Sequence, residues 1–203
     1  RSIARSRESL PLPSPEKEPP RYLSVKYSMP EWIVQLWLDE YGRQITETLL
    51  EGLLRVHPVS LRFCAETGEA QRKRLLEAFS QTGAVWRQSG LLPEVYLVEK
   101  CAGVAALPGF DEGRFAVQDV SSALAVKAAG IRDTDFVMDV CAAPGGKSML
   151  AAETAAQVLA RDVSEEKTAL IEENAARLRR RNVTVQVHDA TVWDETYREK
   201  ADV

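Results

Sequence analysis

Three polar features in the second half of the chain have the residue types of a ligand site. The segment Phe136-Val-Met-Asp-Val-Cys-Ala-Ala-Pro-Gly-Gly-Lys-Ser148 is an apolar run that ends in a Pro-Gly-Gly loop, and two later apolar runs end in Asp162 and Asp189. Adjacent glycines let backbone N–H groups approach a polar or anionic ligand, because no Cβ stands in the way. An ionised carboxylate only accepts hydrogen bonds, so the two aspartates suit ligand hydroxyl and amine donors.

The glycine loop alone indicates a class of ligand. Dinucleotides, nucleotide phosphates and S-adenosylmethionine are all bound where a strand, a glycine loop and a helix start follow one another. A phosphate-binding Walker loop needs G-x-x-x-x-G-K-[ST], and here Gly146, Lys147 and Ser148 fit while Cys141 stands where the first glycine should be. The dinucleotide pattern G-x-G-x-x-G is absent. A nucleotide- or dinucleotide-binding enzyme that uses this Pro-Gly-Gly-Lys loop stays open as an alternative.

Strands alternating with helices would bring these residues together. Apolar runs at 136–140, 157–162 and 183–189 predict strands, and helices are predicted from the loop to about Thr154 and from Ser164 to Arg180. Strands joined in this way lie parallel with right-handed crossovers, as in a doubly wound α/β sheet. Ligands of such sheets bind at the carboxyl ends of the strands, where the loop and both aspartates would lie. The alternative is that the aspartates only cap the elements that follow them.

The first half of the chain predicts a linker and a small α+β domain. Five prolines between Pro11 and Pro20 predict a linker over 1–20. Helices are expected from Tyr27, with Ser28 as its cap and the following tryptophans in a core, and over about 43–54. Further on, the predicted order is strand 60–64, helix 69–81, strand 84–87 and strand 95–99. This β-α-β-β order is typical of a unit like the RNA-recognition motif.

The expected domains are therefore 21–115, small and RNA-facing, and 116–203, a partial Rossmann-like domain. Arg62 is a candidate for RNA contact.

Bulk properties narrow the setting. The 203 residues carry a net charge of −4, with 28% charged and 45% hydrophobic residues, so any RNA contact must be a local basic surface. Three widely spaced cysteines without C-x-x-C favour a reducing compartment such as the cytoplasm and predict no metal site. No apolar run approaches the roughly 20 residues that span a bilayer.

The segment Asp139-x-Cys141-Ala-Ala-Pro-Gly-Gly-Lys147 resembles motif I of the RNA (cytosine-5)-methyltransferases, the Sun/Fmu and NOL1/NOP2 family. The segments 22–28, Pro30-x-Trp32, Leu61-Arg62 and Val117-Gln-Asp119 also resemble the bacterial Sun/Fmu (RsmB-type) branch, which methylates 16S ribosomal RNA. The resemblance implies S-adenosyl-L-methionine as cofactor, ribosomal RNA as partner and no membrane. The cofactor-binding residues that it implies are Cys141, Ala142, Ala143, Pro144, Gly145, Gly146, Lys147, Asp162, Lys167 and Asp189.

The same resemblance implies that parts of the enzyme are missing. The family uses a Pro-Cys and a Thr-Cys downstream of motif I, and neither dipeptide occurs in this chain, so no catalytic residue is expected here. We expect a truncated, inactive piece without the NusB-like upstream domain and the C-terminal catalytic half. A non-catalytic RNA-binding relic is a further alternative. The chain stops where a fourth strand should begin, so strand 136–140 would be an unprotected edge through which the chain self-associates.

Overall fold

The computed structural model describes residues 13–55 and 57–203 and divides the chain into two compact units, Arg1–His57 and Pro58–Val203. The first unit holds α2 (Pro19–Tyr27) and α3 (Glu31–Leu53), which bends at Gly42, where φ is +72°. Leu23, Tyr27, Val34 and Leu50 form its buried core. Residues 1–12 of the expected linker, which include Pro11, lie outside the described residues.

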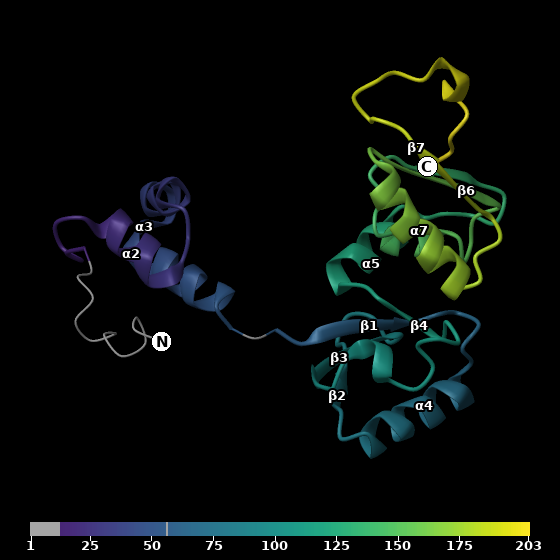
Figure 1. Cartoon of the computed structure of the whole chain (residues 1–203), viewed down its shortest axis with the longest axis horizontal. Helices are drawn as coiled ribbons and strands as arrows, with labels where there is room; N and C mark the ends of the chain where they lie inside the picture. The colour runs from purple at the N-terminus through teal and green to yellow at the C-terminus, as the bar shows by residue number, and fades with distance from the viewer. Residues whose placement is uncertain (1–12, 56) are drawn as a thin grey trace. The chain divides into compact units, whose positions relative to one another are not determined.

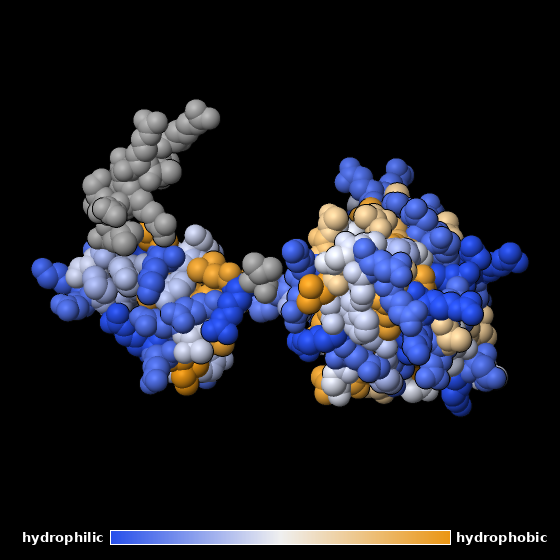
Figure 2. Space-filling view, turned by 90° about the horizontal axis from the view of Figure 1, so that it is seen from below, coloured by the Kyte–Doolittle hydropathy of each residue, from blue (hydrophilic) through white to orange (hydrophobic). Residues whose placement is uncertain are grey.

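Several expectations for the first unit are wrong. Pro19 and Pro20 do not belong to a linker but begin α2, because proline fits the first turn of a helix, where its missing N–H costs nothing. Ser28 does not cap a helix from Tyr27; it ends α2 in the left-handed conformation. Trp32 is 70% exposed and is no core residue, since only one narrow face of the bent α3 packs on α2. Figure 2 shows hydrophobic patches on this unit's surface.

The second unit begins with a four-stranded antiparallel sheet (Figure 1), called here the small sheet. Its order is β2-β3-β1-β4, and α4 packs on it around Phe79. The expected β-α-β-β order is confirmed, and β4 adds a strand beside β1. These elements are β1 (Val59–Phe63), α4 (Glu69–Gln81), β2 (Val85–Gln88), β3 (Val95–Lys100), a 3₁₀ turn (Val104–Ala106) and β4 (Phe115–Val117).

A parallel sheet with the order β5-β6-β7 follows. Val158 and Ala160 on one face of β6 pack against α5, α6 and α7, whereas Leu159 and Arg161 on the other face lie near Tyr197. Asp119 caps α5 and Ser164 caps α7. The elements are α5 (Val120–Ala128), β5 (Phe136–Asp139), α6 (Gly146–Ala151), β6 (Gln157–Asp162), α7 (Glu165–Arg177), β7 (Val183–Val187) and a 3₁₀ turn (Glu195–Tyr197).

The two sheets belong to one compact unit. Cys64 and Ala116 of the small-sheet region share a core with Met149, Ile171 and Ala175 of the parallel-sheet region. The domain boundary expected between residues 115 and 116 falls inside β4. Residues 116–203 lie in the same compact unit as the small sheet, and their treatment as a separate domain remains a proposal. In residues 13–55 and 57–203, no helix is both long and apolar enough to cross a membrane.

The outer edge of β5 is not bare. Met138 donates its backbone N–H to the Val203 carbonyl at 2.8 Å, and the Asp202 N–H reaches the Phe136 carbonyl at 2.9 Å. The last two residues therefore pair with the first half of β5, on the side away from β6. The expectation of an unprotected edge is wrong for Phe136 to Met138. Self-association through the rest of this edge stays a prediction, which a concentration-independent monomer in sedimentation would contradict.

Gly113 generates a prediction about the contact between the small-sheet region and α7. A Cβ at Gly113 would lie 2.1 Å from the Arg177 carbonyl oxygen, and φ there is +68°. Gly113→Ala should therefore cost about 1–3 kcal/mol of backbone strain and a further 1–3 kcal/mol of overpacking, measured by urea unfolding. Gly83→Ala is the control: φ is +79° with open space around the Cβ, so only strain should appear. Equal losses for both variants would contradict this contact.

Candidate functional site

The glycine loop is closed by Asp139 at the end of β5. One Asp139 oxygen accepts the Ser148 hydroxyl at 2.7 Å, and the other accepts the Cys141 N–H at 3.3 Å. The loop turns at Gly145, where φ is +103° and a Cβ would lie 3.3 Å from the Met149 methyl group. Glycine is needed here both for the backbone conformation and for the space. Asp139 therefore holds residues on both sides of the loop, the Cys141 backbone before it and the Ser148 side chain after it.

Asp162 joins this loop to the end of β6. Its carboxylate is buried and accepts the Ala143 N–H at 2.9 Å and the Val163 N–H at 2.8 Å. The Lys167 ammonium lies 3.1 Å from the same group. These two backbone N–H groups, and then Lys167, hold the pKa of the Asp162 carboxyl below its usual value. An ionised acceptor therefore sits between the loop and the second strand.

Asp189 lies at the neighbouring strand end. The His188 N–H donates to the Asp162 carbonyl at 2.9 Å, so the ends of β6 and β7 lie side by side. Asp189 is exposed, and one of its oxygens accepts the N–H and the hydroxyl of Thr191, at 2.9 and 2.7 Å. These bonds from Thr191 lower the pKa of the Asp189 carboxyl. Asp189 therefore does hold the turn that follows β7, which is the alternative role that the sequence left open. Its second carboxylate oxygen accepts no hydrogen bond from the described residues.

The structure brings most of the predicted residues together. The loop, Asp162 and Lys167 are in direct contact, and Asp189 follows on the next strand. Cys141, Pro144 and Lys147 are exposed, while Ala142 and Gly145 are buried beneath them. A cavity of about 390 Å³ adjoins the loop, bordered by Asp139, Cys141 and Lys147 and walled by apolar residues of α5 and β5.

Arg62 lies elsewhere. It is 1% exposed, and its guanidinium bonds to Gln118 and Glu153 inside the second unit. This burial contradicts the expectation that Arg62 contacts RNA: the strand position was right, but the buried carboxylate of Glu153 draws the side chain inward.

Two supporting side chains were missed. Asn174 of α7 donates to the Pro144 carbonyl at 2.8 Å and so holds the loop from the helix side. Arg161, 4% exposed, bonds to Gln186 and to Asp194, at 2.7 Å, and stacks over the Tyr197 ring. Arg161 and Thr196 lower the pKa of Asp194 to about 2. The sequence did contain a signal for the Arg161 contact, because an arginine stands within an otherwise apolar strand. It contained no such signal for Asn174, which is one polar residue among others on a helix.

The three cysteines form no disulfide bond. Cys64 is buried, and this burial raises the pKa of its thiol, so a reactive thiolate is not favoured there. Cys141 is exposed at the loop and Cys101 is half-buried after β3.

Known proteins share this fold. NSun6 from Pyrococcus horikoshii superposes with a TM-score of 0.69 at 16% identity, over 77% of this chain and 65% of that chain. A methyltransferase homolog protein from Pyrococcus horikoshii gives a TM-score of 0.68 at 20% identity, over 86% of this chain and 56% of that chain. The parallel sheet, with its glycine loop after the first strand and acids after the next two, thus has the Rossmann-like fold that these proteins share.

Sequence comparisons are more specific. The family model for the 16S rRNA methyltransferase RsmB/F matches residues 127–202. The probable ribosomal RNA small subunit methyltransferase B of Bacillus subtilis (strain 168) is 31% identical over 196 residues, 94% of this chain and 43% of that protein. Ribosomal RNA small subunit methyltransferase B of Citrobacter koseri is 32% identical over 156 residues, 76% of this chain and 36% of that protein. The chain belongs to this RsmB/F family and spans less than half the length of these two curated relatives.

Asp162 generates a prediction about pH. Because its folded-state pKa is lowered, the ionised carboxylate stabilises the fold above its unfolded pKa, about 3.9, and this stability is lost as the pH falls toward the folded pKa. Asp162→Asn should lower the urea midpoint near pH 7, since an amide cannot accept both backbone N–H groups equally well. The gap from wild type should narrow below about pH 4.

The exposed Asp133→Asn is the control and should change the midpoint little at any pH. A gap for Asp162→Asn that is constant from pH 3 to pH 7 would show that the charge of Asp162 does not hold the loop.

Proposed function

We propose that this chain is the cofactor-binding part of an S-adenosyl-L-methionine-dependent enzyme that methylates cytosine C5 in small-subunit ribosomal RNA. The observation that carries the proposal is the meeting of the glycine loop, Asp162 and Asp189 at adjacent strand ends. Family membership supports the ribosomal substrate. An enzyme with this substrate works where ribosomes are made, in keeping with the cytoplasmic setting expected from the cysteines.

The chemistry of these groups fits the cofactor. Gly145 allows the loop to turn at φ +103° and to pack directly against Met149 and Ile171 of the core. Asp162 offers acceptor capacity for ribose hydroxyls, since a carboxylate has about four lone-pair sites and its three described donors use three. The free oxygen of Asp189 can accept the exocyclic amine of adenine. Lys167, half exposed, lies beside the ribose acid.

In the reaction, the bound cofactor supplies an electrophilic methyl group, and this chain's residues bind and orient it. The loop and Asp162 would hold it at the carboxyl edge of the sheet, where Asp162 is an ionised hydrogen-bond acceptor at neutral pH.

Methylation of C5 needs a second group. Cytosine C5 is a weak nucleophile, so a thiolate must add at C6 before C5 attacks the methyl group. Buried Cys64 is unsuited, and neither Cys101 nor Cys141 lies in the Pro-Cys or Thr-Cys context of the family. We therefore assign the nucleophile to a cysteine of the complete protein outside these residues. Bisulfite sequencing of rRNA treated with the complete protein tests whether C5 is the methylated atom. C5 methylation protects the target cytosine from conversion, so full conversion of every cytosine would contradict C5 methylation.

Ligand preference distinguishes the proposal from its nucleotide-binding alternative. S-adenosylhomocysteine should bind the wild-type chain in isothermal titration calorimetry more tightly than ATP or NAD. Asp189→Asn should weaken S-adenosylhomocysteine binding by about tenfold, because the charged acceptor of the adenine amine is lost.

Asp133→Asn is the matched control, because this exposed aspartate precedes the amino end of β5 whereas the loop follows its carboxyl end, and it should leave binding unchanged. Tighter binding of ATP or NAD than of S-adenosylhomocysteine would overturn the proposal in favour of a nucleotide enzyme.

A further inference from the structure

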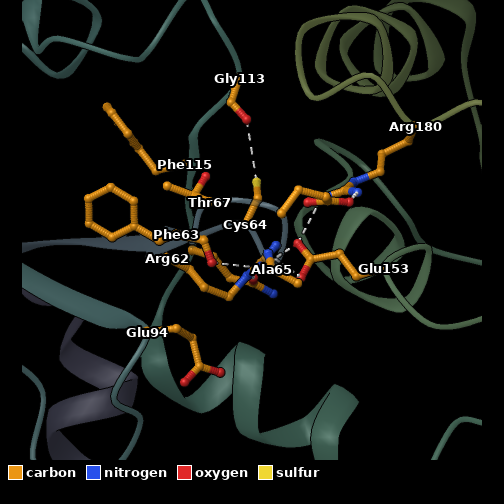
Figure 3. Close-up of polar contacts among 12 residues, drawn as sticks. Arg62, Phe63, Cys64, Ala65, Thr67, Glu94, Gly113, Phe115, Glu153 and Arg180 are labelled. Carbon is orange, nitrogen blue, oxygen red and sulfur yellow. Dashed lines mark hydrogen bonds and ion pairs between the residues drawn. The ribbon is translucent and has the colours of Figure 1, made fainter. Parts of the chain in front are cut away.

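Arg62 is a buried cation with two partners on different elements. It lies on β1 of the small sheet and is 1% exposed. Its Nε donates to the Gln118 carboxamide oxygen at 2.6 Å, and its Nη1 donates to the Glu153 carboxylate at 2.6 Å. Figure 3 shows Arg62 and Arg180 directed toward Glu153 from opposite sides. A buried charge with this pairing is costly to misplace, so its geometry constrains both partners.

The first partner lies at the start of α6. Gln118 follows β4, is 4% exposed, and anchors its own backbone N–H on the Ser60 carbonyl at 3.1 Å. A Cβ built on Gly146 would lie 3.9 Å from Gln118 Cγ and 4.0 Å from its Nε2, so this side chain packs on the second loop glycine. Because a guanidinium only donates, the carboxamide oxygen must face Arg62, which sets the orientation of the whole group.

The second partner lies just beyond the end of α6. Glu153 comes two residues after Ala151, the last residue of that helix. Its carboxylate also accepts Arg180 Nη2 at 2.8 Å and the Ala65 backbone N–H at 3.1 Å. Arg180 in turn pairs with Glu66. Glu153 is therefore fixed to the small-sheet region and to the end of α7 at the same time.

Cys64, Glu66 and Glu153 bring a thiol and two carboxylates within 4.8 Å of one another, which is a spacing that metal ligands can have. Both carboxylates are already paired with arginines, however, so their charge is neutralised without an ion. We therefore interpret this cluster as a set of ion pairs that fixes the end of α6, rather than as a metal site.

We propose that Arg62 is a positioning residue for the glycine loop, acting on α6 from both ends through Gln118 and Glu153. α6 has only six residues, too few to be stable by itself, so its position depends on its core packing and on the contacts at its two ends. The glycine loop leads directly into this helix. The small sheet thus sets the conformation of the loop through the buried guanidinium of Arg62. The expected effect on ligand affinity rests on the proposed function.

The test compares Arg62→Lys with Phe79→Leu in the whole chain. Lysine keeps the positive charge beside Glu153, but a single ammonium cannot reproduce the planar fork that reaches Gln118 as well. Phe79 is fully buried in the small-sheet core and has no role at α6, so its substitution is a destabilised control. The test measures hydrogen exchange of the free protein, as the rate at amides 147–153 divided by the rate at β6 amides. This ratio should rise about tenfold over wild type in Arg62→Lys and should stay at the wild-type value in Phe79→Leu.

Affinity gives a second readout. The dissociation constant of S-adenosylhomocysteine should rise about tenfold in Arg62→Lys and in Gln118→Met, and it should not change in Phe79→Leu. In the double variant Arg62→Lys/Gln118→Met, the dissociation constant should rise by less than the product of the two single increases, because both changes break the same contact. Equal exchange ratios at 147–153 in Arg62→Lys and Phe79→Leu would overturn the inference. A wild-type chain that fails to bind S-adenosylhomocysteine contradicts the proposed function instead, and the exchange experiment still decides the role of Arg62.

Discussion

The site depends on one buried carboxylate. Asp162 accepts the backbone N–H groups of Ala143 and Val163, which belong to the loop after β5 and to the turn after β6. A carboxylate held by backbone donors keeps its charge, and a charge that is buried keeps its donors in place. The loop conformation and the ionisation of Asp162 therefore support each other.

The surroundings of this interaction are built from the whole second unit. Asn174 of α7 holds the loop at Pro144, and Ser148 holds it at Asp139. Beneath it, α6 is packed between the parallel sheet and the small sheet, with Glu153 in the buried charge cluster. The small sheet takes part in this arrangement, because Arg62 of β1 bonds to Glu153 just after α6 and to Gln118, which packs beside Gly146. This arrangement gives a physical reason for two differently built sheets to form one compact unit.

Local patterns in the sequence predicted the local structure well. The apolar run ending at Asp162 became β6 with the predicted ends, and Asp119 and Ser164 cap the helices that follow them. Such features depend on neighbouring residues, so the sequence displays them directly. The glycine loop and its two acids could be predicted for the same reason, since strand ends in a parallel sheet meet at one edge.

Long-range contacts could not be predicted in this way. Arg62 and Glu153 are separated by 91 positions, and nothing near Arg62 shows that a carboxylate waits for it inside the fold. The pairing of Asp202 and Val203 with β5 likewise depends on where the chain returns to the sheet. Trp32 was misplaced because helical spacing shows which residues share a face, not whether another element covers that face.

The most direct test of this account is a ¹⁵N-edited NMR titration of the chain with S-adenosylhomocysteine. Binding at the strand ends predicts the largest amide shifts within 141–147, at Val163 next to Asp162, and within 189–191, with smaller shifts along the small sheet. Shifts confined to other parts of the chain, or the same pattern produced more strongly by ATP, would contradict the assignment of this edge as an S-adenosylmethionine site.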